Sequence, residues 1–420
     1  MQAAPTSVVI RCSRRSGGLD GAMTDDPLPV LRLRPKADAR RIRFGYPWVH
    51  LDEVVTDRRA RSLPPGTLAQ LQNAERAPLG LVAVDIEQRI AARLLDRDPS
   101  ARIDSGWLSN RLDAALALRT RLYDAPFYRL VHAEADALPA TIVDRFGEVA
   151  VIQPNAAWID ARVEMLAEAL VARGMPHVLL NASGRTRAAE GLGAESRWLR
   201  GGVDAPVEVP MNGAVYLADL TGGQKTGLFY DQRPNHAFAA RLAPGGAVLD
   251  VFSHVGGFGL AALAGGAARV TCVDGSGPAL ALAEAGAGQM GRSADIETHR
   301  GDAFEVMAAL GAEGARFDAV VADPPAFAPN RGALGAGLRA YERVARLAAP
   351  LVAPGGFLTL CSCSHAADLT KFRQACLRGI GRAGRDAQLI RTGFAGPDHP
   401  VHPQLGETGY LKALTFRLMP

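Results

Sequence analysis

The C-terminal half of the sequence alternates short apolar runs with longer helix-like runs, and this alternation constrains the fold more than any other feature. The apolar runs include AVLDVF, RVTCVD, FDAVVADPP and GFLTLCSCS, and the helix-like runs between them include ALALAEAGA, RAYERVARLAAPLV and DLTKFRQACLRGI. Strands that alternate with helices form a parallel sheet with helices on both faces. Residues 207–420 are therefore predicted to form a doubly wound α/β sheet with ligands at the carboxyl ends of its strands.

A leader and two smaller domains are predicted before this sheet. Residues 1–27 lack hydrophobic periodicity and are expected to be a disordered leader, within which Met23 is an alternative start. Residues 28–100 contain short apolar runs separated by Pro and Gly, which favours a small β-rich domain. Residues 101–206 combine two helical runs with the strand-like runs ATIVDRF and EVAVIQP around Gly147, so we expect an α+β domain.

Two glycine-containing segments are predicted to form turns or loops. VYLADL and LFYDQR lie on either side of TGGQKTG, and we expect them to pair as a hairpin with Gly222 and Gly223 at its turn. RGALGAGLR, at residues 331–339, is expected to be a mobile loop over the site.

Composition and charge limit the class of partner. Hydrophobic residues make up 48% of the chain and charged residues 21%, which is typical of a folded globular protein. Between Val30 and Ser62 there are nine basic residues against four acidic ones, which favours a polyanionic partner such as nucleic acid. The alternative is that this arginine-rich chain produces such clusters without function.

The segment RIRFGYPWVH in this region indicates either RNA contact or an ordinary hairpin with Trp48 in the core.

Five scattered cysteines form no disulfide framework, which is typical of a protein in a reducing cytoplasm. The Cys-x-Cys pair lacks the spacing of a zinc site, so we expect no metal. The sequence has no uninterrupted apolar run of membrane-spanning length, so we expect no membrane partner.

The segment VLDVFSHVGGFG, at residues 248–259, predicts a cofactor site. It is a strand followed by a glycine turn that opens a helix, and such a turn lets the backbone approach a ligand closely. Asp274 ends the next strand, where a ribose-binding acid is expected, and Asp302 closes a further strand in RGDAF, where it can accept the adenine amino group. Since the loop lacks the strict glycine pattern of pyrophosphate binders, it favours a nucleoside ligand such as S-adenosylmethionine (SAM). Each acid alone is also a common helix cap.

The segment VVADPPAF, at residues 320–327, predicts a second part of the site. Asp323 ends an apolar strand, and two prolines and Phe327 follow it. A carboxylate on a rigid turn beside an aromatic ring suits a planar substrate, although Asp-Pro is also common in plain loops.

Cys363, in GFLTLCSCSH, predicts covalent chemistry. Strand alternation places Cys361 and Cys363 on one face, with Cys363 nearer the carboxyl edge. A thiolate there can attack C6 of a cytosine, which makes C5 nucleophilic towards the sulfonium methyl group. A free cysteine is otherwise a small core residue, and this is the prediction for Cys361, Cys272 and Cys376.

The sequence resembles the bacterial large-subunit ribosomal RNA 5-methylcytosine methyltransferases that join an N-terminal PUA domain, a central α+β domain and a class I methyltransferase domain. The resemblance runs from about Leu31 to Pro420. Its motifs are YPWVH, RLVHAEADALPATIVDRFG, KTGLFYDQR, FSHVGGF, DPPAF, CSCS and DHPVHPQLGETGYLK.

The resemblance implies roles for individual residues. SAM would be bound by the loop after the first strand and by acids at later strand ends: Phe252, Ser253, His254, Gly256, Gly257, Phe258, Asp274, Asp302, Asp323 and Pro324. Cys363 would be the nucleophile, and Asp323 would hydrogen-bond the cytosine and help protonate N3. The substrate pocket would be shaped by Tyr230, Asp231, Gln232, Arg233, Pro325 and Phe327, with Arg233 also able to meet a phosphate.

One departure from the family concerns the residue after the two prolines, which is often Lys and is Ala326 here. Any role of that lysine must move elsewhere, and Arg331 and Arg339 are the candidates from the sequence.

These features predict a cytoplasmic enzyme that methylates cytosine C5 in 23S ribosomal RNA with SAM, through a covalent Cys363 adduct. The alternatives are a SAM-dependent enzyme that methylates a base nitrogen, and a non-catalytic RNA-binding assembly factor. The expected partner is large-subunit ribosomal RNA. A homodimer is compatible with the sequence, which specifies neither the oligomeric state nor the target cytosine.

Overall fold

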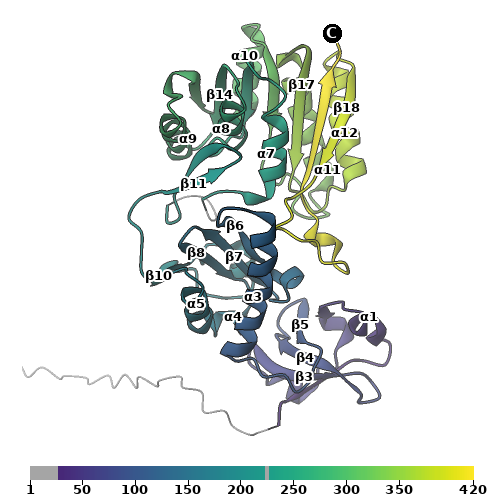
Figure 1. The fold of residues 1–420 in the computed structure, drawn as a ribbon. Helices are drawn as coiled ribbons and strands as arrows, with labels where there is room; N and C mark the ends of the chain where they lie inside the picture. Colours follow the sequence, from purple (N-terminus) through teal and green to yellow (C-terminus); the bar gives the residue numbers. More distant parts are fainter. Residues whose placement is uncertain (1–26, 223–226) are drawn as a thin grey trace, which may run out of the picture.

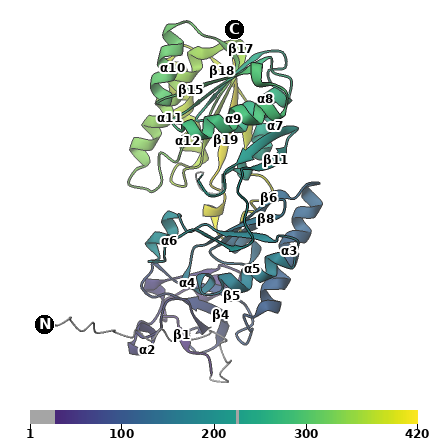
Figure 2. The same cartoon turned by 90° about the vertical axis from the view of Figure 1, so that its left-hand side faces the viewer.

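A computed structural model describes residues 27–222 and 227–420 and stacks three domains along one axis (Figures 1 and 2). The predicted leader, except for its last residue, lies outside the described residues, as does Gly223. Each domain is organised around a sheet of its own. Those sheets occupy residues 30–96, 127–200 and 247–418, while the exact domain limits at 28, 101 and 207 stay predictions.

The N-terminal domain has the predicted β-rich character. Its elements are β1 (Val30–Arg32), α1 (Ala39–Arg43), β2 (Trp48–His50), α2 (Arg58–Arg61), β3 (Thr67–Gln72), β4 (Pro78–Val84) and β5 (Ile90–Asp96). The strands form one sheet in the order β1-β3-β4-β5-β2. The hairpin alternative for RIRFGYPWVH is wrong, because its first residues belong to α1, which Asp38 caps. Trp48 is only half-buried, and its indole donates a 2.8 Å hydrogen bond to Glu134 of the next domain.

The central domain is an α+β unit, as predicted. Its elements are α3 (Ser105–Leu122), β6 (Phe127–His132), β7 (Thr141–Phe146), β8 (Val149–Pro154), α4 (Ala157–Asp160), α5 (Val163–Val171), β9 (His177–Leu180), α6 (Arg185–Ala189) and β10 (Arg197–Arg200). The strand order is β10-β9-β8-β7-β6. β7 and β8 form the predicted hairpin, and Gly147 takes a φ of +65° at its turn. Helices α3 and α5 pack against this sheet through Leu112 and Leu166.

The predicted hairpin around TGGQKTG is wrong. The strand β12 (Ala214–Ala218) pairs instead with the preceding β11 (Val207–Met211). Asn212 and Gly213 form the turn with φ values of 56° and 77°, and this backbone twist matches that of antiparallel strands. The segment LFYDQR runs instead into a 3₁₀ turn, η3 (Tyr230–Gln232), and the helix α7 (Arg233–Ala239).

The C-terminal domain confirms the predicted α/β sheet. Its elements are β13 (Ala247–Val251), α8 (Gly257–Ala264), β14 (Arg269–Asp274), α9 (Gly277–Gln289), β15 (Ile296–Arg300), α10 (Ala303–Ala312), β16 (Phe317–Ala322), α11 (Leu334–Ala348), β17 (Val352–Ser362), α12 (Leu369–Arg382), β18 (Ala387–Gly393) and β19 (Lys412–Leu418). The order is β15-β14-β13-β16-β17-β19-β18, with β19 antiparallel to both neighbours.

Both faces of this sheet are covered, as its apolar strands require. Leu249 and Val251 pack into a core with α10, α11 and α12. Val248, on the opposite face, packs into a core with α8, α9 and the hairpin β11–β12. The strand order reverses direction between β13 and β16, and this switch point is where ligands bind in such sheets.

The segment RGALGAGLR is mostly helical, so the prediction of a mobile loop is wrong. Helix α11 begins at Leu334, and it packs against the DPPAF segment. A Cβ atom on Gly337 would lie 2.7 Å from both the Phe327 carbonyl oxygen and the Ala328 methyl carbon. The glycine is therefore explained by close packing rather than by loop flexibility.

Residues 394–411, which we call the C-terminal tail, connect the domains. The tail leaves the sheet after β18, lies beside the central domain and returns as β19 (yellow in Figure 1). The buried Arg119 of α3 donates to the Asp398 carbonyl at 2.8 Å, and the Arg129 amide donates to the Asp398 carboxylate at 3.0 Å. The tail therefore fastens the central domain to the sheet that carries the candidate site.

Candidate active site

The predicted chemical groups gather at the carboxyl edge of the C-terminal sheet. Asp274 is the last residue of β14, Asp323 follows β16 and Cys363 follows β17. Asp302 follows β15, and residues 252–256 form the turn between β13 and α8. Because these strands are parallel, their carboxyl ends share one edge of the sheet.

The turn after β13 has an unusual backbone that its neighbours hold in place. Phe252 and His254, neither of which is glycine, have φ values of 62° and 51°. The Ser253 amide donates to the Val273 carbonyl at 3.0 Å, and the His254 amide donates to the Asp274 carboxylate at 2.9 Å. Strained backbone of this kind is concentrated at ligand sites, where the surrounding structure enforces it.

The predicted adenosine-binding acids also hold backbone amides. Asp274 accepts hydrogen bonds from the amides of His254 and Ser276, at 2.9 and 2.8 Å. Asp302 caps α10 and accepts from the Phe304 and Glu305 amides, so the capping alternative applies to it. Capping and ligand binding are compatible, because each carboxylate oxygen has two lone pairs.

An aromatic cluster lies beside these acids. The rings of Phe252, Phe304 and Phe327 have centroids 6.2 to 6.4 Å apart. They come from the turn after β13, from α10 and from the DPPAF segment, so the cluster joins three strand ends. A glycine turn, carboxylates for ribose hydroxyls and apolar rings for adenine form a donor set that fits SAM.

Asp323 is oriented by a chain of buried amides. The Asp323 amide donates to the Val251 carbonyl at 3.1 Å, which ties the DPPAF segment to the end of β13. Its carboxylate accepts a 2.9 Å hydrogen bond from Gln232 of η3, and Asn235 donates to the Gln232 side-chain oxygen at 2.7 Å. Gln232, predicted as a pocket residue, therefore contacts the predicted catalytic acid directly. Pro324 is buried behind Asp323, and Pro325 is exposed.

Two predicted pocket residues face the central domain instead. The Tyr230 hydroxyl donates to the Arg145 carbonyl at 2.9 Å, and its ring lies 5.2 Å from that of Phe146. The Arg233 guanidinium donates to the Phe127 carbonyl at 3.0 Å and lies 4.2 Å above the Tyr123 ring. These contacts hold α7 against the central domain.

The Asp231 side chain, between these residues, faces the C-terminal tail. It accepts a 2.6 Å hydrogen bond from the Tyr410 hydroxyl. η3 therefore contacts both Asp323 and the end of the tail.

Cys363 lies one residue beyond β17, in a segment fixed by its two neighbouring serines. The Ser362 and Ser364 hydroxyls lie 2.8 and 2.7 Å from the Tyr341 hydroxyl of α11. Ser364 also accepts a 3.0 Å hydrogen bond from the Ala328 amide. The thiol-bearing segment and the DPPAF segment are thus joined directly.

Burial separates Cys363 from the other described cysteines. Cys363 is half-buried, whereas Cys272, Cys361 and Cys376 are buried in β14, β17 and α12. Those three are core residues, as predicted. Burial raises the pKa of each of their thiols, which keeps the thiols neutral.

Sequence reasoning missed several polar residues at this edge. Asp250 lies inside the apolar strand β13, and its carboxylate accepts from the Gly259 amide at 2.8 Å. Burial raises the pKa of the Asp250 carboxyl to about 7. Lys412 begins β19, and its side chain is turned into the protein next to Ser364. The available signal for Asp250 was one charged residue in an apolar strand, and for Lys412 a charged residue at the start of a mostly apolar strand.

The two arginines proposed to replace the family lysine are exposed. Arg331 precedes α11, and Arg339 lies on it. Ala326 is exposed as well.

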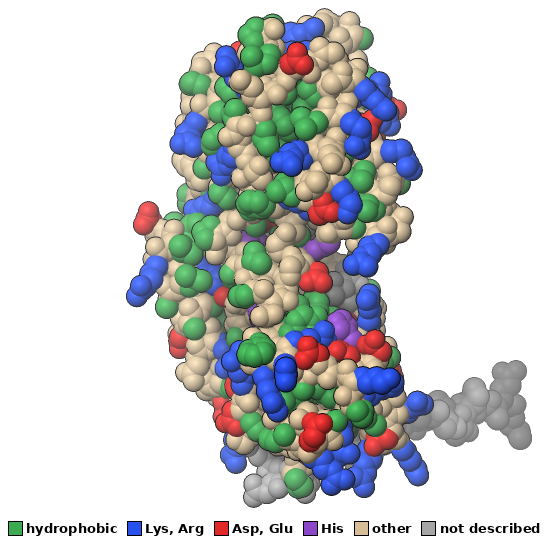
Figure 3. All heavy atoms as spheres, turned by 90° about the vertical axis from the view of Figure 1, so that its right-hand side faces the viewer, with side chains coloured by type: hydrophobic (Ala, Val, Ile, Leu, Met, Phe, Trp, Pro, Cys, Tyr) green, Lys and Arg blue, Asp and Glu red, His purple; other side chains and the backbone are tan. Residues whose placement is uncertain are grey.

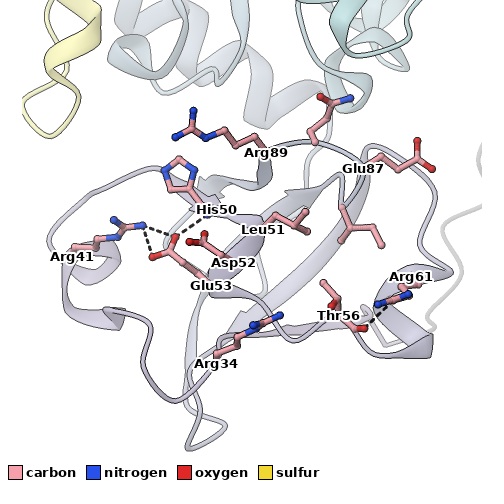
Figure 4. Close-up of a pocket in the computed structure, with 12 residues that line it drawn as sticks. Arg34, Arg41, His50, Leu51, Asp52, Glu53, Thr56, Arg61, Glu87 and Arg89 are labelled. Atoms are coloured by element: carbon pink, nitrogen blue, oxygen red, sulfur yellow. Dashed lines mark hydrogen bonds and ion pairs between the residues drawn. The ribbon is translucent and has the colours of Figure 1, made fainter. Parts of the chain in front are cut away.

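A second candidate site is a hollow of about 1040 Å³ in the N-terminal domain (Figure 4). Four arginines line it, together with His50 and the acids Asp52, Glu53 and Glu87; the arginines are Arg34, Arg41, Arg61 and Arg89. On the face seen in Figure 3, Lys and Arg side chains gather with acidic ones around this end of the molecule.

Most of these arginines are held by their own domain. Arg41 forms an ion pair with Glu53, while Arg34 and Arg61 donate to the Val54 and Thr56 carbonyls at 2.7 and 3.0 Å. Figure 4 shows Arg89 at the rim of the hollow that faces the other domains.

Within residues 27–222 and 227–420, no helix combines the length and apolar character needed to cross a bilayer. Over the same residues, no group of three His, Cys, Asp or Glu side chains is arranged to bind a metal ion.

Comparison with known proteins identifies the family. Residues 164–417 match the model of the S-adenosylmethionine-dependent methyltransferases, and residues 31–97 match that of the PUA-like domain. A ribosomal RNA large subunit methyltransferase of Deinococcus radiodurans is 34% identical over 93% of this chain and 98% of its own length. Ribosomal RNA large subunit methyltransferase I of Pseudoalteromonas atlantica is 30% identical over 92% and 98% of the two chains.

Solved structures show the same fold. A SAM-dependent methyltransferase from Streptococcus mutans aligns with a TM-score of 0.77 at 18% identity, over 93% of this chain and all of that one. A methyltransferase complexed with SAH aligns with a TM-score of 0.78 at 19% identity, with the same coverage. The chain therefore belongs to the family of PUA-containing, SAM-dependent methyltransferases that includes these ribosomal RNA large subunit enzymes, and its cofactor is SAM.

Proposed function

We propose that this protein forms 5-methylcytosine in 23S ribosomal RNA through a covalent adduct between Cys363 and the base. The observation that carries the proposal is the direct link between the Cys363 segment and the Asp323 segment, through the 3.0 Å hydrogen bond from Ala328 to Ser364. The proposal is supported by the pairing of β16 with β17, because Asp323 and Cys363 follow these two adjacent strands, beside the turn that suits SAM. The names of the relatives support ribosomal RNA of the large subunit as substrate.

The proposed reaction begins with the Cys363 thiolate adding to C6 of the cytosine. The S–C6 bond forms while Asp323 hydrogen-bonds the base and assists protonation at N3. C5 then gains electron density and takes the methyl group, which SAM supplies as a sulfonium-bound electrophile. Methyl transfer to C5 leaves the donor as the corresponding thioether. Loss of the C5 proton to a base, return of the N3 proton to Asp323 and cleavage of the S–C6 bond then release the product and restore the thiolate.

The surrounding residues have distinct parts in this proposal. Gln232 fixes the Asp323 carboxylate, and the exposed Pro325 and the Phe327 ring border the base. Tyr230 and Arg233 act through the domain contact rather than on the base. The target base must leave any stacked helix to reach the thiol.

The N-terminal hollow is the proposed contact for flanking RNA. Its exposed arginines can bind phosphates, and phosphate contacts give affinity without sequence information.

Since ribosomal RNA is the proposed partner, we place the protein in the cytoplasm. A homodimer remains a separate proposal, which sedimentation velocity of the purified protein would test.

Replacing the nucleophile tests the mechanism. A Cys363→Ala variant should lose methyl transfer to below detection, because the adduct is proposed to form on the Cys363 sulfur, while its SAM affinity in calorimetry should stay within about twofold. The readout is mass-spectrometric mapping of methylated nucleotides in 23S RNA from cells with and without the protein. Cys376→Ala, which removes a buried thiol in α12, is the matched control and should retain activity. Full activity of Cys363→Ala would rule out the covalent route.

The alternative of methylation at a base nitrogen keeps the same site. The Asp-Pro-Pro segment with its fixed carboxylate is the observation that favours methylation at a base nitrogen. Such a carboxylate can accept a hydrogen bond from an exocyclic amino group. That chemistry needs no cysteine, so the Cys363→Ala variant separates the two reactions. Failure of the wild-type protein to bind SAM would instead favour a non-catalytic assembly factor.

A further inference from the structure

We propose that Lys412 is a positioning residue that fixes the Cys363 segment and stabilises the Cys363 thiolate with its buried charge. This inference rests on the proposed function of Cys363. It concerns a residue on the antiparallel strand, far from the glycine turn and the Asp-Pro-Pro segment in the sequence.

The backbone brings Lys412 to the thiol segment. Lys412 begins β19, and its Cα partner in the neighbouring strand is Ser362, the residue immediately before Cys363. Its Nζ atom donates hydrogen bonds to the carbonyl oxygens of Ser364 and Ala367, both at 2.8 Å. One ammonium group therefore holds two points of the segment that follows the cysteine.

Burial explains why a charge at this position needs an anion. Lys412 is 5% exposed, and a buried ammonium is costly unless it is paired with a negative group. The two carbonyl groups solvate the charge but do not neutralise it. Burial lowers the pKa of Lys412, whereas Cys363 in its thiolate form and Asp368 raise it. The Cys363 thiolate and Asp368 are therefore the candidate anionic partners of Lys412.

Cys363 is the better partner of the two. Asp368 caps α12, and its carboxylate already forms a 2.6 Å ion pair with the exposed Lys371. Other titratable groups near the thiol are Tyr341 on α11, Tyr410 at the end of the tail and the buried Cys361, and burial raises the pKa of all three. The Asp323 carboxylate follows the adjacent strand β16, and its negative charge disfavours a nearby thiolate, so a cation is needed to offset it.

His365 also faces Lys412. Burial and the Lys412 charge lower the pKa of its imidazole, so it is neutral at physiological pH. Among the described residues, Lys412 is consequently a cation that favours the thiolate form of Cys363. Lys412 supplies this positive charge from the neighbouring strand β19. Ala326, at the position where the family often has lysine, carries no charge.

The test measures the titration of Cys363 without using methyl transfer. The full-length protein is treated with iodoacetamide from pH 5 to 10, and modification of the Cys363 peptide is followed by mass spectrometry. Lys412→Gln keeps a hydrogen-bond donor but removes the charge. Its alkylation profile should shift to higher pH by about one unit, so that modification at pH 7 slows about tenfold. Lys412→Arg keeps the charge and should stay near the wild-type profile.

Controls distinguish an effect of the Lys412 charge on thiol titration from a general effect on folding. Lys36→Met removes an exposed charge in the N-terminal domain and should leave the profile unchanged. Thermal melts and SAM calorimetry establish that each variant is folded. Should Lys412→Gln fail to fold, Lys412→Met, which fills the same volume without a polar end, replaces it.

An unshifted profile in a folded, SAM-binding variant without the Lys412 charge would overturn the inference. This result differs from a failure of the proposed reaction. If Cys363→Ala retained methyl transfer, the covalent mechanism would fall, but the effect of Lys412 on thiol titration would still be measured in the cysteine-containing protein.

Discussion

The edge of the C-terminal sheet and the hollow of the N-terminal domain are both rich in polar groups, but they hold them in opposite ways. At the sheet edge, Gln232, Ser364 and Lys412 are all less than 6% exposed. Each forms a hydrogen bond with a residue that is distant in the sequence. In the hollow, Arg34, Arg61 and Arg89 are exposed to water. The first arrangement fixes geometry, and the second leaves charge accessible to a partner.

Dielectric screening explains what this difference means for function. Charges and dipoles that are removed from water interact strongly and need little reorganisation during a reaction. Exposed charges interact weakly and are screened within about 8 Å at physiological salt. We therefore expect substitutions at the sheet edge to change chemistry or folding, and substitutions in the hollow to change RNA affinity in a salt-dependent way.

After the loss of the Cys363 thiol, the largest effect is expected for Asp323→Asn at the sheet edge. The asparagine side chain cannot carry the proton that Asp323 is proposed to transfer. Its nitrogen is also a donor, whereas both oxygens of the carboxylate can accept from Gln232. Turnover at saturating RNA should fall by about 10² or more. Radioactive methyl transfer from SAM measures this. Asp386→Asn, at an exposed position before β18, should retain full turnover, and equal activity of both variants would contradict the role of Asp323.

The second prediction concerns the pH dependence of stability at Asp250. Its pKa is raised from 3.8 to about 7 by burial, so the folded protein binds more protons than the unfolded chain between these values. Stability is therefore lost as pH rises through this window, by a few kcal/mol at most. Asp250→Asn lacks the ionisation and can still accept from the Gly259 amide.

Thermal melts from pH 5 to 8 test this prediction. The melting temperature of Asp250→Asn, relative to wild type, should rise as pH increases. The exposed Asp386→Asn variant should show no such trend. A constant difference across the pH range would mean that Asp250 does not titrate there in the folded protein.

The smallest effect is expected for Arg89→Ala in the hollow. Loss of one exposed phosphate contact should weaken RNA binding a few-fold and reduce the slope of log affinity against log salt by about one. Turnover at saturating RNA should not change, because the sheet edge is untouched. Fluorescence anisotropy with a ribosomal RNA fragment at several salt concentrations measures both quantities. Arg59→Ala, on α2 outside the hollow, is the matched control, and equal effects of the two variants would argue against a specific site.

The elements that the sequence predicted correctly are those governed by local pattern. Apolar runs and their spacing predicted many strands of the three sheets, among them β7, β8, β13 and β16, but no strand was predicted at β18 or β19. Asp274, Asp323 and Cys363 were placed at strand ends, and strand ends in a parallel sheet share one edge. The pattern failed at RGALGAGLR, because its glycines serve the packing of α11 against Phe327 rather than a loop.

The sequence by itself thus determined the α/β class, and it led to the proposals of the turn after β13 as the cofactor site and of Cys363 as the nucleophile, since each depends on residues close together in the chain. Only the tertiary structure decided which polar residues surround them. Lys412 reaches the Cys363 segment because β19 runs antiparallel beside β17, and Tyr230 and Arg233 turn to the central domain because α7 packs there. Contacts between distant segments depend on strand order and domain packing, which no local pattern encodes.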